Sequence, residues 1–209
     1  MTNVDDIHSY GIDVKNREIY LHSYISSLDE DPGVDYRMAC TFTKNLRILD
    51  FVNKNPIVIH MHSIGGNVSA GMAIFDSIKM CKSYVTIIAY GQAESMSSLI
   101  LQAADYRLMT NNSYFMCHFG SFSMDANVLD VINAIDHEKR CVQKMLNIYV
   151  DSALNGKYFK EAMTRPTRKK VESFIKHRMK SGDWYLDAEE AVYYGFADDY
   201  VGSSTCKFS

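Results

Sequence analysis

The hydrophobic and polar positions of this chain alternate between helical and strand-like spacing. From residue 36 to 52 apolar residues recur at helical spacing, and Asn55-Pro56 ends that helix. The run IVIHMH has the composition of a buried strand, and the turn SIGGN and a short helix around 72–78 follow it. A second strand, YVTIIAY, precedes the helical stretch SMSSLILQAAD, and YRLMT and SYFMCHF are shorter strands. This order predicts an α/β fold with parallel strands joined by right-handed crossovers.

One predicted helix is much longer than the others. It runs from Asp125 to about Leu154 and is too long for an ordinary crossover, so we expect it to project and pack against another subunit. A basic helix over 168–179 and a short helix that Gly195 ends complete the chain. No internal repeat interrupts the sequence, which predicts a single domain over 1–209. The long helix carries one apolar stripe, made of Val128, Ile132, Ile135, Val142, Met145 and Tyr149.

Composition and charge limit the classes of partner and the compartment that we expect for this protein. The 209 residues are 47% hydrophobic and carry a net charge of −3, which gives no electrostatic reason to expect a nucleic-acid partner. No apolar run is long enough for a bilayer, and the N-terminus has no apolar signal region, so we expect neither a membrane nor a secretory address. The five cysteines form no CxxC pair, and reduced thiols indicate a cytoplasmic compartment.

The segment GQAESMSSLI raises the first question of chemistry. Ser95 follows a strand and a short turn and stands at the start of a helix, where backbone N–H groups lack partners. A serine there can cap the helix, or it can be a nucleophile beside a ready anion site. The local sequence alone favours the cap.

Three further elements have a structural and a chemical interpretation. The Gly65-Gly66 pair is either a tight turn or a backbone ligand site. His118 ends a short strand, and Asp183 lies in a loop before the last helix, where Asp187 is predicted to be the N-cap of a capping box with Glu190. In that order the elements supply a backbone anion site, a nucleophile, a base and an acid.

His60 and His62 alternate on one strand and face the same side. No third ligand stands at a fixed offset, so we predict no metal site.

These motifs together resemble the proteolytic subunit of the Clp protease, ClpP, from about Asp6 to the C-terminus. IVIHMHSIGGNVSAGMAIFDSIK is similar to the family's strand, Ser-Pro-Gly-Gly turn and helix, and GQAESMSS to its nucleophile turn. NNSYFMCH is similar to the strand that ends in the catalytic histidine, and DWYLDAEEAVYYGFAD to the stretch with the catalytic aspartate.

The resemblance implies a crotonase-like α/β subunit with a projecting handle, here about 119–154. It implies a serine endopeptidase that works through an acyl-enzyme, with Ser95 as nucleophile, His118 as base and Asp183 as orienting acid. The oxyanion donors would be the N–H groups of Gly66 and Met96. The subunit would need no metal or cofactor of its own.

The resemblance also implies partners. Family members stack two seven-membered rings around a chamber, and an ATP-driven AAA+ unfoldase feeds unfolded polypeptide into it. The positions that match the lining of the unfoldase pocket are Val58, His60, Met80, Ile88, Tyr90 and Leu108.

The sequence departs from the family at several of these places. Ile64 replaces proline, Glu94 replaces a small residue and Ser97 replaces glycine. Two tyrosines expected in the unfoldase pocket are missing, and the Asp–Arg pair that bridges the rings aligns with Met179 and Gly182.

Two other functions are compatible with parts of the pattern. A catalytically weak or regulatory ring subunit that mixes with a conventional Clp protease fits the altered pocket. An acyl-CoA enzyme of the crotonase type shares the fold but has no use for Ser95, His118 and Asp183 together. Because all three residues are present, the peptidase is the favoured interpretation.

Overall fold

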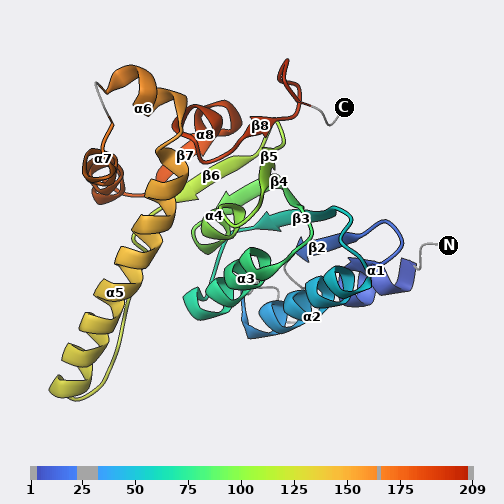
Figure 1. The fold of residues 1–209 in the computed structure, drawn as a ribbon. Helices are drawn as coiled ribbons and strands as arrows, with labels where there is room; N and C mark the ends of the chain where they lie inside the picture. Colours follow the sequence, from blue (N-terminus) through green and yellow to red (C-terminus); the bar gives the residue numbers. More distant parts are fainter. Residues whose placement is uncertain (1–3, 23–32, 164–165, 207–209) are drawn as a thin grey trace.

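The computed structural model describes residues 4–22, 33–163 and 166–206. A twisted eight-stranded sheet runs through it in the order β1-β2-β3-β4-β5-β8, and β6 and β7 branch from β4 (Figure 1). Strands β2 to β5 are parallel, as the sequence predicts. The strands are β1 (Ile12–Asp13), β2 (Glu18–His22), β3 (Ile57–Ser63), β4 (Val85–Glu94), β5 (Tyr106–Met109), β6 (Tyr114–Cys117), β7 (Trp184–Asp187) and β8 (Asp199–Tyr200).

Strand β4 is shared by two neighbours. Its first half pairs with β5 and its last residues, 92–94, pair with β6. Between these halves β4 has a bulge, in which its residues 90–92 lie opposite the single residue His62 of β3. Gly91 has a φ of +57° in this bulge, and a Cβ there would lie 2.6 Å from the His62 ring. The bulge redirects the end of β4, where Ser95 follows.

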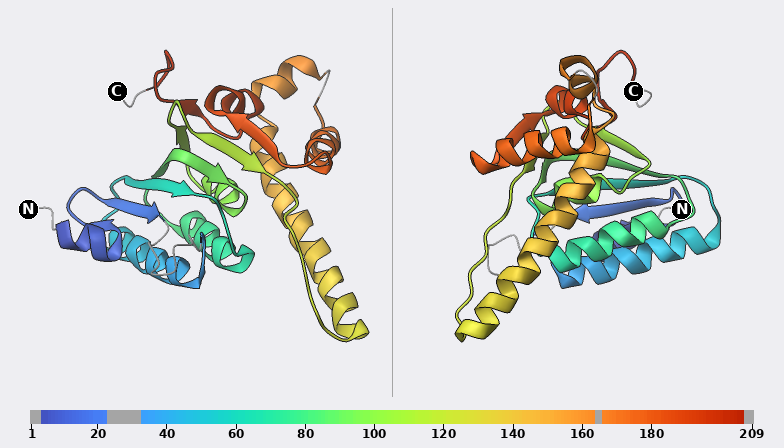
Figure 2. Two further views of the ribbon diagram at one scale, coloured as in Figure 1. Left: turned by 180° about the vertical axis from the view of Figure 1, so that it is seen from behind. Right: turned by 60° about the vertical axis from the view of Figure 1, so that its left-hand side comes forward.

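Helices α2 (Tyr36–Val52) and α3 (Val68–Met80) lie side by side on one face of β2, β3 and β4 (Figures 1 and 2). Each has the N-cap that its sequence offers, because Asp35 accepts from the Met38 N–H and Asn67 from the Ala70 N–H. The short helix α1 (Val4–Tyr10) leads into β1.

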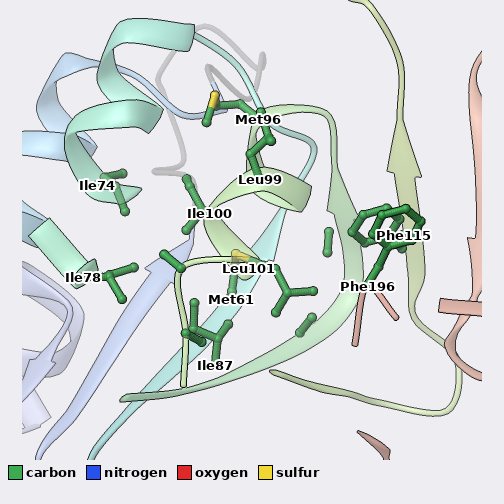
Figure 3. Close-up of a cluster of buried hydrophobic side chains, with 14 of the residues drawn as sticks. Met61, Ile74, Ile78, Ile87, Met96, Leu99, Ile100, Leu101, Phe115 and Phe196 are labelled. Atoms are coloured by element: carbon green, nitrogen blue, oxygen red, sulfur yellow. The ribbon is translucent and has the colours of Figure 1, made fainter. Parts of the chain in front are cut away.

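Helix α4 (Met96–Leu101) is buried on all sides, as expected for a helix with no polar stripe. Figure 3 shows its apolar side chains beside α3 and the strands. The helix is shorter than predicted because the N–H groups of residues 102–104 bond three residues back instead of four. The labelled side chains of this core are Met61, Ile74, Ile78, Ile87, Met96, Leu99, Ile100, Leu101, Phe115 and Phe196.

Helix α5 (Val128–Ala153) projects from the body, and residues 119–127 run back along it (Figures 1 and 2). It begins three residues later than predicted, because Asn127 caps it by accepting from the Asp130 N–H. At its base Tyr149 packs edge-on against Phe115 and Phe196. In the part of the chain that the structure describes, no helix is both long and apolar enough to cross a membrane.

The remaining helices surround that base. They are α6 (Lys157–Ala162), which the sequence did not indicate, α7 (Arg168–Lys180) and α8 (Ala188–Tyr194). Helix α7 buries Val171, Ile175 and Met179 and leaves most of its basic residues exposed. Helix α8 has the predicted capping box, and Gly195 ends it in the left-handed conformation.

Arg17 holds the end of α2 from a distant part of the chain. Its guanidinium is buried and donates to the carbonyls of Leu49, Asn53, Asn55 and Pro56 and to Ser83 Oγ. Helices leave their last carbonyls unpaired, so this side chain serves as a C-cap for α2.

Candidate active site

Ser95 lies at a sharp turn between β4 and α4. Its φ is +51°, which is rare for a residue with a Cβ and marks a strained position. The Ser95 N–H donates to the Met116 carbonyl at 2.8 Å. The Ser95 side chain makes no capping hydrogen bond to α4, so its hydroxyl is available for another partner.

That partner is His118. His118 Nε2 lies 2.8 Å from Ser95 Oγ, and His118 Nδ1 lies 3.0 Å from Asp183 Oδ1. The three side chains therefore form one continuous hydrogen-bonded series.

The strand register explains why residues so far apart in sequence meet. Glu94 of β4 pairs with Met116 of β6, and Cys117 of β6 pairs with Trp184 of β7. The residues just beyond these strand ends are Ser95, His118 and Asp183. The sequence did not indicate strand β7, because the stretch around Asp183 is predicted to be a loop.

The arrangement has a definite chemical capacity. With a proton on Nδ1 donated to Asp183, Nε2 is left as an acceptor for the Ser95 O–H, as in Ser-His-Asp hydrolases. Half of the Asp183 side chain and about a quarter of the His118 side chain are exposed. The set thus faces solvent rather than the core.

Residues 63–67, called here the glycine turn, lie directly against Ser95. A Cβ on Gly65 would come within 2.7 Å of Ser95 Cβ and 2.8 Å of the Met96 nitrogen, so only glycine permits this approach. The Gly65 carbonyl accepts from the Val34 N–H at 2.6 Å. In a trans peptide the N–H points away from the carbonyl, so the Gly66 N–H points away from Val34.

Met96 is the first residue of α4, and a first-turn N–H has no intrahelical partner. The structure thus brings the Gly65–Gly66 peptide and the start of α4 together beside Ser95.

The rim of the site carries negative charge. Glu94, Met116 and Tyr185 occupy neighbouring register positions on one sheet face, and Gln92 Nε2 donates to Glu94 Oε1 at 3.3 Å. The Glu94 carboxylate, then burial and Asp183, raise the pKa of Tyr185.

Two serines of α4 make contacts that the sequence analysis did not foresee. Ser97 Oγ donates to Ser63 Oγ at 2.7 Å. Ser98 Oγ donates to the Ser95 carbonyl at 2.6 Å and also lies 2.7 Å from the Tyr149 hydroxyl. The available signal was two hydroxyls inside an otherwise apolar, buried helix, because buried hydroxyls need partners.

The positions matched to an unfoldase pocket lie mostly on the sheet face opposite α2 and α3. His60, Ile88 and Leu108 are register neighbours on β3, β4 and β5, and Val58 lies two residues before His60. Leu108 is fully buried, so it offers no surface to a partner, contrary to the prediction. Met80 is 74% exposed at the end of α3.

The chain's own aromatic side chains occupy this face. Tyr20 stacks on the His60 ring at 4.8 Å between centroids, and the Tyr90 hydroxyl lies 2.9 Å from His60 Nδ1. His62 Nδ1 lies 2.7 Å from the Tyr90 carbonyl. Among the described residues no three His, Cys, Asp or Glu side chains are grouped as metal ligands.

Comparison with known proteins defines the family. The model of the Clp protease family matches residues 16–204, and the chain therefore belongs to the Clp protease family. An ATP-dependent Clp protease proteolytic subunit 2 from Pseudomonas aeruginosa is 30% identical over 82% of this chain and 78% of its own length. The Deinococcus radiodurans proteolytic subunit is 29% identical over 80% of this chain and 76% of its own.

A solved structure confirms the fold class. A ClpP1 point mutant from Listeria monocytogenes superposes with a TM-score of 0.72 over 91% of this chain and 94% of its own, at 19% identity. The predicted resemblance to ClpP and the predicted α/β fold are both confirmed.

Proposed function

We propose that this member of the Clp protease family is a serine endopeptidase in which Ser95, His118 and Asp183 form the catalytic triad. The observation that carries the proposal is the unbroken hydrogen bonding from Asp183 through His118 to Ser95 Oγ. The strained Ser95 backbone supports it, because strain of this kind concentrates at functional sites.

The mechanism uses three side chains, two backbone N–H groups and water. His118 Nε2 takes the Ser95 proton as Oγ attacks the peptide carbonyl, and Asp183 holds the imidazolium through Nδ1. The Gly66 and Met96 N–H groups stabilise the oxyanion. His118 then gives its proton to the leaving amine, and water hydrolyses the acyl-enzyme.

We propose that the chain works as a ring, and that two seven-membered rings enclose the chamber. The apolar residues along the outer part of α5 are exposed in the isolated chain, and assembly would bury them. An AAA+ unfoldase would supply unfolded polypeptide and consume the ATP. The reducing cytoplasm remains the expected compartment.

A regulatory ring subunit is the second candidate, and one observation favours it. Tyr20, His60 and Tyr90 contact one another on the face on which an unfoldase would dock. A subunit with an altered docking face can still enter a mixed ring and change its activity.

Labelling with a fluorophosphonate tests the proposal. The wild-type chain should label stoichiometrically and cleave a fluorogenic peptide, and Ser95→Ala should do neither while still assembling. Ser113→Ala is the control for a serine outside the site, because Ser113 is buried and its hydroxyl donates to the local Thr110 carbonyl. Stoichiometric labelling of Ser95→Ala would refute the assignment, and an unlabelled wild type that changes the activity of a conventional Clp protease would favour the regulatory subunit.

A further inference from the structure

A pair of buried hydroxyls connects α4 to the glycine turn. Ser97 Oγ donates to Ser63 Oγ at 2.7 Å, and the Gly65 N–H donates to the same Ser63 Oγ at 3.2 Å. Ser63 is 1% exposed and Ser97 is fully buried. Water therefore cannot replace either partner, and the loss of the Ser63 hydroxyl leaves both the Ser97 hydroxyl and the Gly65 N–H without this acceptor.

The bulge in β4 makes this contact possible. After the bulge Ser63 pairs with Ala93, two residues before Ser95. The end of β3 is thereby placed against the first turn of α4, within reach of Ser97. Without the extra residues of the bulge, a different part of β4 would face Ser63.

The glycine turn has little stiffness of its own. Gly65 has a φ of +92° and Gly66 a φ of +148°, and glycine occupies such conformations without a side chain to restrict them. Val34 holds the turn from one side, through its N–H to the Gly65 carbonyl and its carbonyl to the Asn67 N–H at 2.7 Å. Ser63 holds it from the other side through the Gly65 N–H.

We infer that Ser97 and Ser63 are positioning residues, which set the Gly66 N–H at a fixed place relative to the Met96 N–H. This inference rests on the proposed function, because it concerns the oxyanion site of that reaction. Ser97 and Met96 are adjacent residues of one rigid helix. A hydrogen bond from Ser97 to the glycine turn therefore ties one donor to the other.

The kinetic consequence follows from when the oxyanion exists. A tetrahedral oxyanion forms during acylation and again during deacylation but not in the bound substrate, so misplaced donors lower kcat and leave substrate binding unchanged. Removing a whole oxyanion donor costs roughly 100- to 1,000-fold in kcat. Loosening a donor that remains present should cost less, about tenfold.

The experiment compares four chains of full length, namely wild type, Ser97→Ala, Ser63→Ala and the double variant. We expect kcat for a fluorogenic peptide to fall about tenfold in each single variant with KM within about twofold. Because the two hydroxyls act as one unit, the double variant should be no worse than Ser63→Ala. The rate of fluorophosphonate labelling should fall by the same factor.

Ser113→Ala controls for the loss of a buried serine hydroxyl, and thermal unfolding of every variant controls for stability. Unchanged kcat in both single variants would overturn the inference, and so would independent, multiplicative losses in the double variant. Should Ser97→Ala fail to fold, Ser63→Ala carries the test alone. Ser95→Ala separates the two claims, because residual activity in that variant would overturn the triad itself.

Discussion

The two halves of α5 carry the same amphipathic pattern and meet opposite surroundings. In the inner half, residues 141–153, four residues are buried against the body, including Tyr149 and Val150. In the outer half, residues 128–140, none is buried, and the apolar side chains of Val128, Leu129 and Ile132 are at least half exposed. One half belongs to the core of this chain, and the other is only partly covered by the described residues, with Val131 and Ala134 half-buried.

The difference shows what an apolar stripe can indicate. Helical spacing tells which face of a helix avoids water, but it does not tell whether the covering surface belongs to the same chain. Predictions on the two halves therefore differ in kind, because the inner half should control folding and the outer half assembly.

The largest expected effect is on folding, from Tyr149→Ala. This ring is fully buried and packs edge-on against the stacked rings of Phe115 and Phe196, and its removal should lower the free energy of unfolding by about 3–5 kcal/mol. Urea denaturation followed by circular dichroism measures it. Ile132→Ala in the outer half is the matched control and should change stability by less than about 0.5 kcal/mol. Equal losses in the two variants would abolish the distinction between the halves.

Next in size is the effect of charge on assembly. A chain with both Leu129→Asp and Ile132→Asp should keep its monomer stability and assemble at least about tenfold more weakly, or about 1.4 kcal/mol. Native mass spectrometry and size-exclusion chromatography report the species present. Wild-type assembly should persist at about 0.5 M salt, because apolar burial is not screened. Dissociation of the wild type at that salt concentration would point to an ionic interface instead.

A smaller effect separates the Tyr149 ring from its hydroxyl. Tyr149→Phe keeps the packing but removes the contact with Ser98 Oγ, and should cost about 1 kcal/mol. Ser98 still donates to the Ser95 carbonyl, so its hydroxyl is not left unpaired. Thermal unfolding gives the value, and a loss as large as that of Tyr149→Ala would contradict the importance given to the ring.

The smallest effect concerns the polar contact between α5 and α7. Hydrogen bonds from Lys176 and Gln143 lower the pKa of Glu172 from its usual 4.5. A carboxylate with a lowered pKa stabilises the fold above its unfolded pKa and loses that contribution as pH falls through its folded pKa. Glu172→Gln should therefore cost less than about 0.5 kcal/mol at pH 7, and nothing well below pH 4. Unfolding midpoints of the wild type and of Glu172→Gln are measured over a pH series. A difference between the two chains that grows as the pH falls would contradict the prediction.

The parallel pairing of the central strands and the bounds of α2 were predictable, because hydrophobic periodicity and the Asn-Pro break are local signals. The meeting of Ser95, His118 and Asp183 was predicted through the resemblance, and local sequence alone favoured a cap at Ser95. The hydrogen bond between Ser97 and Ser63 depends on a bulge in β4. A bulge is a shift in the register between two paired strands, so it cannot be predicted from the sequence of either strand alone.

The contacts of His60 with Tyr20 and Tyr90 could not be predicted from the sequence either. Tyr20 of β2 reaches His60 because the two residues are register partners, and each strand read alone looks only partly polar. Helix α6 has only six residues, which is too short for a hydrophobic periodicity that would predict a helix.

The buried guanidinium of Arg17 makes the N-terminal strands part of the stability of α2. Its acceptors lie 32 to 66 residues away along the chain, so this cap exists only when β2 is docked on β3. If β2 detached, the last carbonyls of α2 would lose their hydrogen bonds from the Arg17 guanidinium at the same time. In hydrogen exchange the amides of β2 and of the final turn of α2 should then open as one cooperative unit, although they are distant in sequence.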